Sequence, residues 1–102
     1  MASRLNLQSE LEELLGTRNV YFQPPASKKL KYPCIVYNLS DISSRYANDK
    51  AYLNTKAYQV TVIDRDPDSD LVSRLMAHFS YISFDRHFNA DNLNHDVLRL
   101  YY

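Results

Sequence analysis

Glycine, cysteine and tryptophan are almost or entirely missing from this sequence of 102 residues, which has one Gly, one Cys and no Trp. With Gly16 alone, the chain cannot form a glycine-rich phosphate loop or the G-x-S-x-G turn of a serine hydrolase. With Cys34 alone, an intramolecular disulfide is impossible, which is typical of a reducing compartment. Because Cys34 lies in the apolar run 33–37, we expect a buried and unreactive thiol.

The sequence also has no net charge, since 12 basic residues balance 12 acidic ones. Binding of duplex DNA depends on a basic surface that neutralises phosphates, so this balance disfavours a nucleic-acid-binding module. No apolar run approaches the length of a membrane span, and the N-terminal residues lack the apolar centre of a signal peptide. We therefore expect a soluble protein, made in the cytoplasm, with no membrane partner.

Tyrosine, in contrast, is abundant, with nine residues. Tyrosine favours β-strands and is enriched at the centres of protein–protein interfaces. The length predicts a single domain over residues 1–102, because a chain of this size buries roughly 65% of its unfolded surface and can hold one modest core.

The first predicted element is a helix that begins between residues 3 and 5. Four leucines recur at helical spacing, at Leu7, Leu11, Leu14 and Leu15. Gly16 follows this stripe and suits the left-handed position at which many helices end.

A second helix is predicted to open within the aspartate run, at residues 66–70. Asp66 can cap its N-terminus, and Pro67 suits the first helical position. Its apolar stripe consists of Leu71, Val72, Leu75, Met76 and Phe79.

Strands are predicted at residues 19–23, 34–40 and 56–64, and a C-terminal hairpin at 81–102 turns at 90–92. Consecutive strands with two helices indicate an α+β fold, in which a mixed, mainly antiparallel sheet has both helices on one face. The predicted order is α-β-β-(long arm)-β-α-β-β.

Residues 41–55 are polar, have no clear period and still include Tyr46 and Tyr52. A loop of this length is uncommon in a small domain and usually serves a function. Two interpretations remain open. The segment is either a protruding β-hairpin arm or a flexible loop that orders on assembly.

The aspartate run 64–70 is the strongest candidate for metal binding. An EF-hand loop needs glycine at its sixth position and glutamate at its twelfth, and this run has Ser69 and Leu75 there. Aspartates near a helix N-terminus also satisfy free N–H groups, so we favour capping. A small metal-dependent enzyme that uses this run is kept as an alternative from a different class.

The histidines His78, His87 and His95 do not have metal-ligand spacing. A His and an Asp can meet across the C-terminal hairpin, as a charged pair on a polar face. The basic run 28–31 is interpreted as a solvated turn, and a patch that faces DNA inside a channel or an acidic partner is the alternative. We therefore expect no enzyme activity, no metal and no cofactor.

The order of elements and several segments together resemble the tail terminator (tail completion) proteins of long-tailed bacteriophages with non-contractile tails. The resemblance covers about residues 7–102. The segments that carry it are Tyr-Pro-Cys-Ile-Val-Tyr at 32–37, Tyr-Gln-Val-Thr-Val-Ile-Asp at 58–64, Ser-Phe-Asp-Arg-His-Phe at 83–88, Asp-Asn-Leu-Asn-His-Asp at 91–96 and Leu-Tyr-Tyr at 100–102.

This resemblance implies a structural virion protein at the head–tail interface. It would form a ring, expected to be a hexamer, at the head-proximal end of the tail tube, where it ends tube polymerisation and docks the head-completion (stopper) protein. DNA would pass through the lumen without sequence-specific binding. A head-completion protein or a tail-tube subunit is the alternative within the same assembly.

The resemblance also implies that the arm at 41–55 faces a neighbouring subunit or the lumen. Together with the tyrosine-ended C-terminal strand, it yields a set of candidate interface residues. These are Arg45, Tyr46, Asp49, Lys50, Tyr52, Tyr101 and Tyr102.

Overall fold

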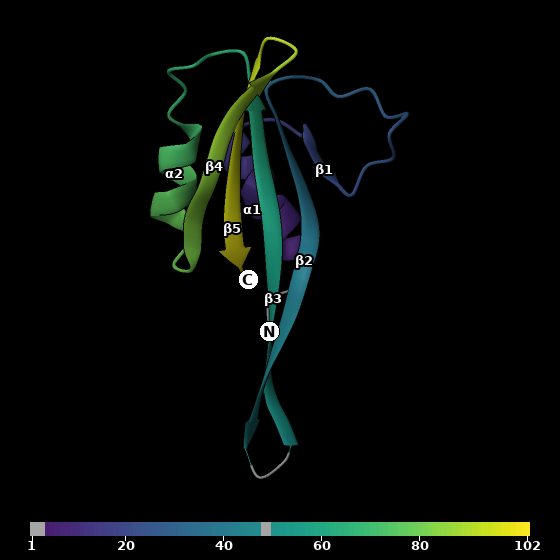
Figure 1. Cartoon of the computed structure of the whole chain (residues 1–102), viewed down its shortest axis with the longest axis vertical. Coiled ribbons are helices and arrows are strands. Elements are labelled where there is room, and N and C mark those ends of the chain that lie inside the picture. Colours follow the sequence, from purple (N-terminus) through teal and green to yellow (C-terminus); the bar gives the residue numbers. More distant parts are fainter. Residues whose placement is uncertain (1–3, 48–49) are drawn as a thin grey trace.

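A computed structural model describes the backbone of residues 4–47 and 50–102, and the side chains of residues 4–40 and 56–102. Two helices and a five-stranded, mostly antiparallel sheet follow one another in the predicted order (Figure 1). The predicted α+β class is therefore confirmed. No helix in these described ranges is long and apolar enough to cross a membrane.

Helix α1 spans Arg4–Leu15 and buries Leu7 and Leu11 completely. It ends as predicted at Gly16, which has a φ of 85° and donates its N–H to the Glu12 carbonyl at 2.8 Å. A positive φ at this position suits glycine, because other residues adopt it only with strain.

Helix α2 spans Leu71–His78, so it begins later than predicted and the expected cap at Asp66 is wrong. The Asp66 N–H donates to Asp64 Oδ1 at 3.0 Å, and the Asp68 N–H donates to Asp66 Oδ1 at 2.9 Å. Aspartate side chains readily accept from the N–H two residues ahead, and these turns compete with helix formation. The aspartate run is therefore a series of turns that leads into the helix.

The sheet has the strand order β1-β2-β3-β5-β4. Its strands are β1 (Val20–Phe22), β2 (Cys34–Ala47), β3 (Lys50–Asp64), β4 (Ile82–Ala90) and β5 (Leu93–Tyr101). β1 is parallel to β2, and the other neighbours are antiparallel. β2 and β3 are longer than predicted, because both continue through the segment at 41–55.

The main core lies between the helices and one face of the sheet. Tyr37 is fully buried there, and its hydroxyl donates to Gln8 Oε1 at 2.5 Å while accepting from Arg4 Nη1 at 3.0 Å. Burial raises the pKa of Tyr37. The buried cluster comprises Leu7, Leu11, Val20, Ile35, Tyr37, Tyr58, Val60, Val62, Leu71, Leu75, Phe79, Leu98 and Leu100.

A smaller cluster on the opposite face of the sheet contains Cys34, Ile63 and Leu93, with Leu30 packed against it. Cys34 is a free cysteine and is completely buried, as predicted. Burial raises the pKa of its thiol to about 11, so the thiol stays protonated at neutral pH.

The β4–β5 hairpin turns at Asp91 and Asn92, which have φ values of 54° and 61°. Two consecutive residues with positive φ are the signature of a type I′ hairpin turn, in which Asn and Asp are tolerated. The turn predicted at 90–92 is therefore confirmed.

We predict that Asn92→Val lowers the free energy of unfolding by about 1–2 kcal/mol, because a β-branched residue is strained at positive φ. Denaturant melts of the two proteins measure this difference. Asn92→Gly is the matched control and should retain or increase stability. Equal stability of the Asn92→Val variant and the parent would contradict the turn geometry.

A polar network joins the C-terminal residue to both helices. The Tyr102 hydroxyl donates to Glu10 Oε2, and His78 Nε2 lies 2.9 Å from Glu10 Oε1. The hydrogen bond from Tyr102, and then the contact with His78, hold the pKa of Glu10 below 4.5. The same bond adds to burial in raising the pKa of Tyr102 to about 12.

We predict that Glu10→Gln lowers the free energy of unfolding at pH 7 by up to about 1 kcal/mol, because the site is partly exposed. A carboxyl whose pKa is lowered by folding stabilises the fold above its unfolded value and loses this effect as the pH falls through the folded value. The difference between variant and parent should therefore shrink below pH 4.5 in melts across pH. Glu13→Gln, on the exposed side of α1, should show no such dependence, and a difference that grows in acid would refute the assignment.

Candidate functional site: the hairpin arm and the free sheet edge

The most prominent feature of the surface is the hairpin formed by residues 41–47 of β2 and 50–56 of β3, which we call the arm. Within it the strands pair from Ile42 opposite Lys56 to Ala47 opposite Lys50. Of the two interpretations of residues 41–55, the structure therefore has the β-hairpin. Register shifts at Leu39/Asp41 and at Arg45/Tyr46 interrupt the ladder, and such irregularities bend and twist a hairpin.

The arm extends beyond the rest of the sheet. β5 pairs with β3 only from Ala57 to Asp64. Six residues of β2 beyond Asp41 correspond to a projection of about 20 Å. The molecule measures 51 × 29 × 23 Å, and its radius of gyration of 14.7 Å exceeds the roughly 13 Å of a compact domain of this length. The arm leaves the sheet at the end opposite the β4–β5 turn (Figure 1).

The structure brings most of the predicted interface residues to one end of the molecule. Arg45, Tyr46, Lys50 and Tyr52 occupy backbone positions in the arm, whereas Asp49 lies outside the described residues.

The two C-terminal tyrosines lie at the base of the arm. Tyr101 pairs with Ala57, and the Tyr102 N–H donates to the Lys56 carbonyl at 3.0 Å. Tyr101 is 37% exposed and accepts a hydrogen bond from Arg99 Nε at 3.0 Å. Tyr102 packs against the main core and donates its hydroxyl within the chain, so it joins the arm's base to the helices.

A second candidate surface, which the sequence analysis did not identify, is the outer edge of β4. In the described sheet this strand is last in order and has a neighbour only in β5. Residues 83–89 are all exposed, and Phe84 and Phe88 are 46% and 41% exposed. The central triplet Asp-Arg-His was a usable signal, because charged residues are typical of edge strands.

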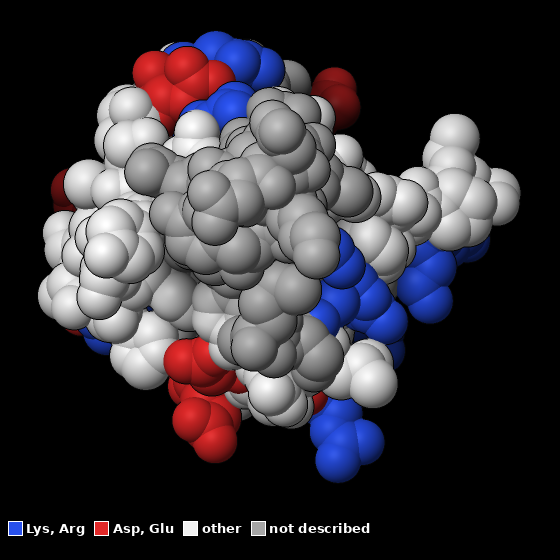
Figure 2. All heavy atoms as spheres, turned by 90° about the horizontal axis from the view of Figure 1, so that it is seen from below, with Lys and Arg blue, Asp and Glu red and all other residues white. Residues whose placement is uncertain are grey.

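Among the side chains that the structure describes, charge does not mark the end of the molecule near the arm as a binding site for a polyanion. Viewed along the long axis from the arm, Lys and Arg side chains form separate groups around the rim, with Asp and Glu among them (Figure 2). The described part of this end therefore does not present a surface of one sign.

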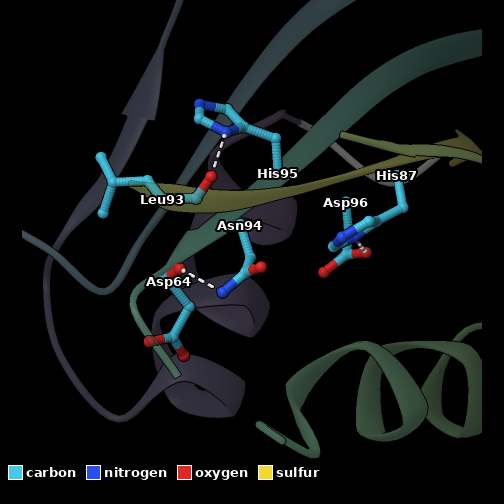
Figure 3. A network of polar contacts seen from close by, with 6 residues as sticks. All are labelled: Asp64, His87, Leu93, Asn94, His95 and Asp96. Atoms are coloured by element: carbon cyan, nitrogen blue, oxygen red, sulfur yellow. Dashed lines mark hydrogen bonds and ion pairs between the residues drawn. The ribbon is translucent and has the colours of Figure 1, made fainter. Parts of the chain in front are cut away.

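A contact between a His and an Asp, which the sequence allows across the C-terminal hairpin, is present. His87 Nδ1 lies 2.6 Å from Asp96 Oδ1, while Asn94 Nδ2 donates to the Asp64 carbonyl at 3.3 Å (Figure 3). The adjacent hollow is also lined by Asp66 and has a volume of about 190 Å³. This volume is below the roughly 300–1,000 Å³ of typical small-molecule sites.

Two of the four aspartates in the run 64–70 serve the local backbone. Asp64 and Asp66 each accept a backbone N–H through Oδ1. Among residues whose side chains are described, no group of three His, Cys, Asp or Glu side chains converges as metal ligands.

No protein-family model matches this sequence, and neither a curated protein nor a solved structure matches it.

We predict that the rest of the domain, which we call the body, folds without the arm. Replacing residues 44–54 by Asn-Gly, which suits a tight hairpin turn, should leave the melting temperature within about 5 °C, or about 1 kcal/mol for a domain of this size. The reason is that residues 50–55 pair with β2 alone in the described backbone. Thermal melting followed by circular dichroism measures the effect, and loss of a cooperative transition would disprove the prediction.

Proposed function

We propose that this protein is a structural subunit of a virion that forms a ring, expected to be a hexamer, at the head-proximal end of a phage tail tube. There it would end tube polymerisation and provide the docking surface for the head-completion protein. DNA would pass through the ring without sequence-specific contacts.

The observation that carries this proposal is the arm, which extends about 20 Å from the end of the sheet. Pairing between two strands alone is marginally stable in water, so a hairpin whose described backbone pairs with no third strand suits a contact with another molecule. A ring needs two different, complementary surfaces on each subunit. The arm and the β4 edge are two different surfaces that suit this requirement.

The sequence supports the same proposal independently. The segments at 32–37, 58–64, 83–88, 91–96 and 100–102 resemble those of tail terminator proteins. Balanced net charge also suits an assembling subunit, because strong charge of one sign would keep identical copies apart.

We predict that particles assembled without this protein carry tails of uncontrolled length that do not join heads. Electron microscopy of negatively stained lysates measures tail length and the fraction of joined particles. The full chain supplied from a plasmid should restore both, and the arm-shortened variant should not, although it folds. Tails of normal length joined to heads in the absence of the protein would refute the proposed function.

The position of the protein in the virion separates the alternatives within the same assembly. A terminator lies between the tube and the head-completion protein, whereas a tube subunit repeats along the whole tail. A tag that is labelled along the whole tail would identify a tube subunit instead. A tag that is labelled only on the head would identify a head-completion protein.

A further inference from the structure

We propose that the free edge of β4 in one copy of this protein binds the arm of a second copy by strand addition. This inference deepens the proposed function and rests on the self-assembly that it requires. It specifies which backbone groups make the contact between subunits.

The two edges of the sheet differ strongly. The edge at β1 has only three residues, and the Gln23 side chain accepts the Leu39 N–H next to it at 3.1 Å. The edge at β4 has nine residues, contains no proline and has one irregularity, between Phe84 and Arg86. Proteins usually shorten, bend or cover a long edge, because its N–H and C=O groups can pair with another strand. β4 is therefore the edge that can accept a strand.

The turn determines which backbone groups of β4 face outward. Ala90 and Leu93 flank a two-residue turn, so they form the pair that exchanges hydrogen bonds. In an antiparallel ladder the next residue points its N–H and C=O away from the partner strand, and the alternation continues along the strand. Asn89 and His87 therefore present their backbone groups to the free edge.

Aromatic side chains lie beside this edge on both faces of the sheet. Phe84 pairs with Leu98, whose side chain joins the helix-covered core. Phe88 pairs with His95 and stacks on its ring, with a centroid distance of 4.6 Å and an angle of 13°. An added strand would thus cover apolar surface above and below itself, in addition to pairing with the backbone.

The arm of a second copy is the occupant that fits this edge. Each arm strand has seven residues, which fits within the nine residues of β4. Each arm strand also has one side without a partner in the described backbone. The arm sequence includes the apolar residues Ile42, Tyr46, Tyr52 and Leu53.

The proposed contact joins two different surfaces and is therefore asymmetric. The arm and the β4 edge are different surfaces, so each copy donates an arm to one neighbour and accepts an arm from another. Such a heterologous contact generates a ring where its rotation closes. Pairing of β4 with β4 of a second copy would instead stop at a dimer.

Asn89→Pro tests the contact at a single backbone group, because proline removes the outward N–H and leaves the β4–β5 ladder intact. Asn89→Ala is the matched control, which removes the side chain and keeps the N–H. In analytical ultracentrifugation over a range of concentrations, Asn89→Pro should raise the dissociation constant of self-association at least tenfold. Asn89→Ala should stay within about threefold of the parent. Equal assembly of both variants, or a parent that remains monomeric, would overturn the inference.

Cross-linking tests the identity of the two surfaces. One copy carries Asn89→Cys and the other Ser44→Cys, while Cys34 is buried in both. A short bismaleimide should link the two copies when they are mixed and should link neither variant alone. Linkage of Asn89→Cys copies to one another would show β4–β4 pairing and overturn the inference, as would no linkage at all.

The failures of the two proposals are distinguishable. If Asn89→Pro assembles normally and still restores head-joined tails, the strand-addition contact is wrong and the proposed function stands. If the contact forms but particles without the protein have normal tails, the contact stands and the proposed function is wrong.

Discussion

Antiparallel pairing of β2 with β3 is the interaction on which the rest of the structure depends. The ladder runs from Cys34 opposite Ile63 to Ala47 opposite Lys50. In its first half, strand alternation turns Tyr37 towards the helices, where its buried hydroxyl needs the hydrogen bonds to α1. In its second half β5 has ended, and the same two strands continue as the arm. One hairpin therefore forms the centre of the core and the most exposed feature of the molecule.

The same sheet that stabilises the domain also carries the two surfaces of the proposed assembly. The body holds its strands through a core on one face of the sheet and a smaller cluster on the other. In the described backbone, the arm pairs with no third strand and β4 has one side without a strand, so hydrogen-bonding capacity is left at two different places. Backbone N–H and C=O groups favour pairing wherever water can be displaced, which makes unpaired edges a natural means of joining identical subunits.

Much of the fold could be predicted because its signals are local. The leucine stripe and Gly16 predicted α1 and its end, and alternation predicted the strand pairing in the C-terminal hairpin. The start of α2 could not be predicted from capping preferences, because the side chains of Asp64 and Asp66 accept nearby backbone N–H groups and form turns first. The strands predicted at 34–40 and 56–64 were also too short. The sequence of residues 41–55 has no alternation of apolar and polar residues from which their continuation could be predicted.

By itself, the sequence determined the α+β class, the order of elements, the buried state of Cys34 and the location of the arm. These follow from periodicity and composition, which act over a few neighbouring residues. Only the tertiary structure decided that the arm is a hairpin, that Tyr102 joins Glu10, and what the strand order of the sheet is. The reason is physical: pairing partners and sheet order depend on contacts between residues far apart in the chain, which no local pattern encodes.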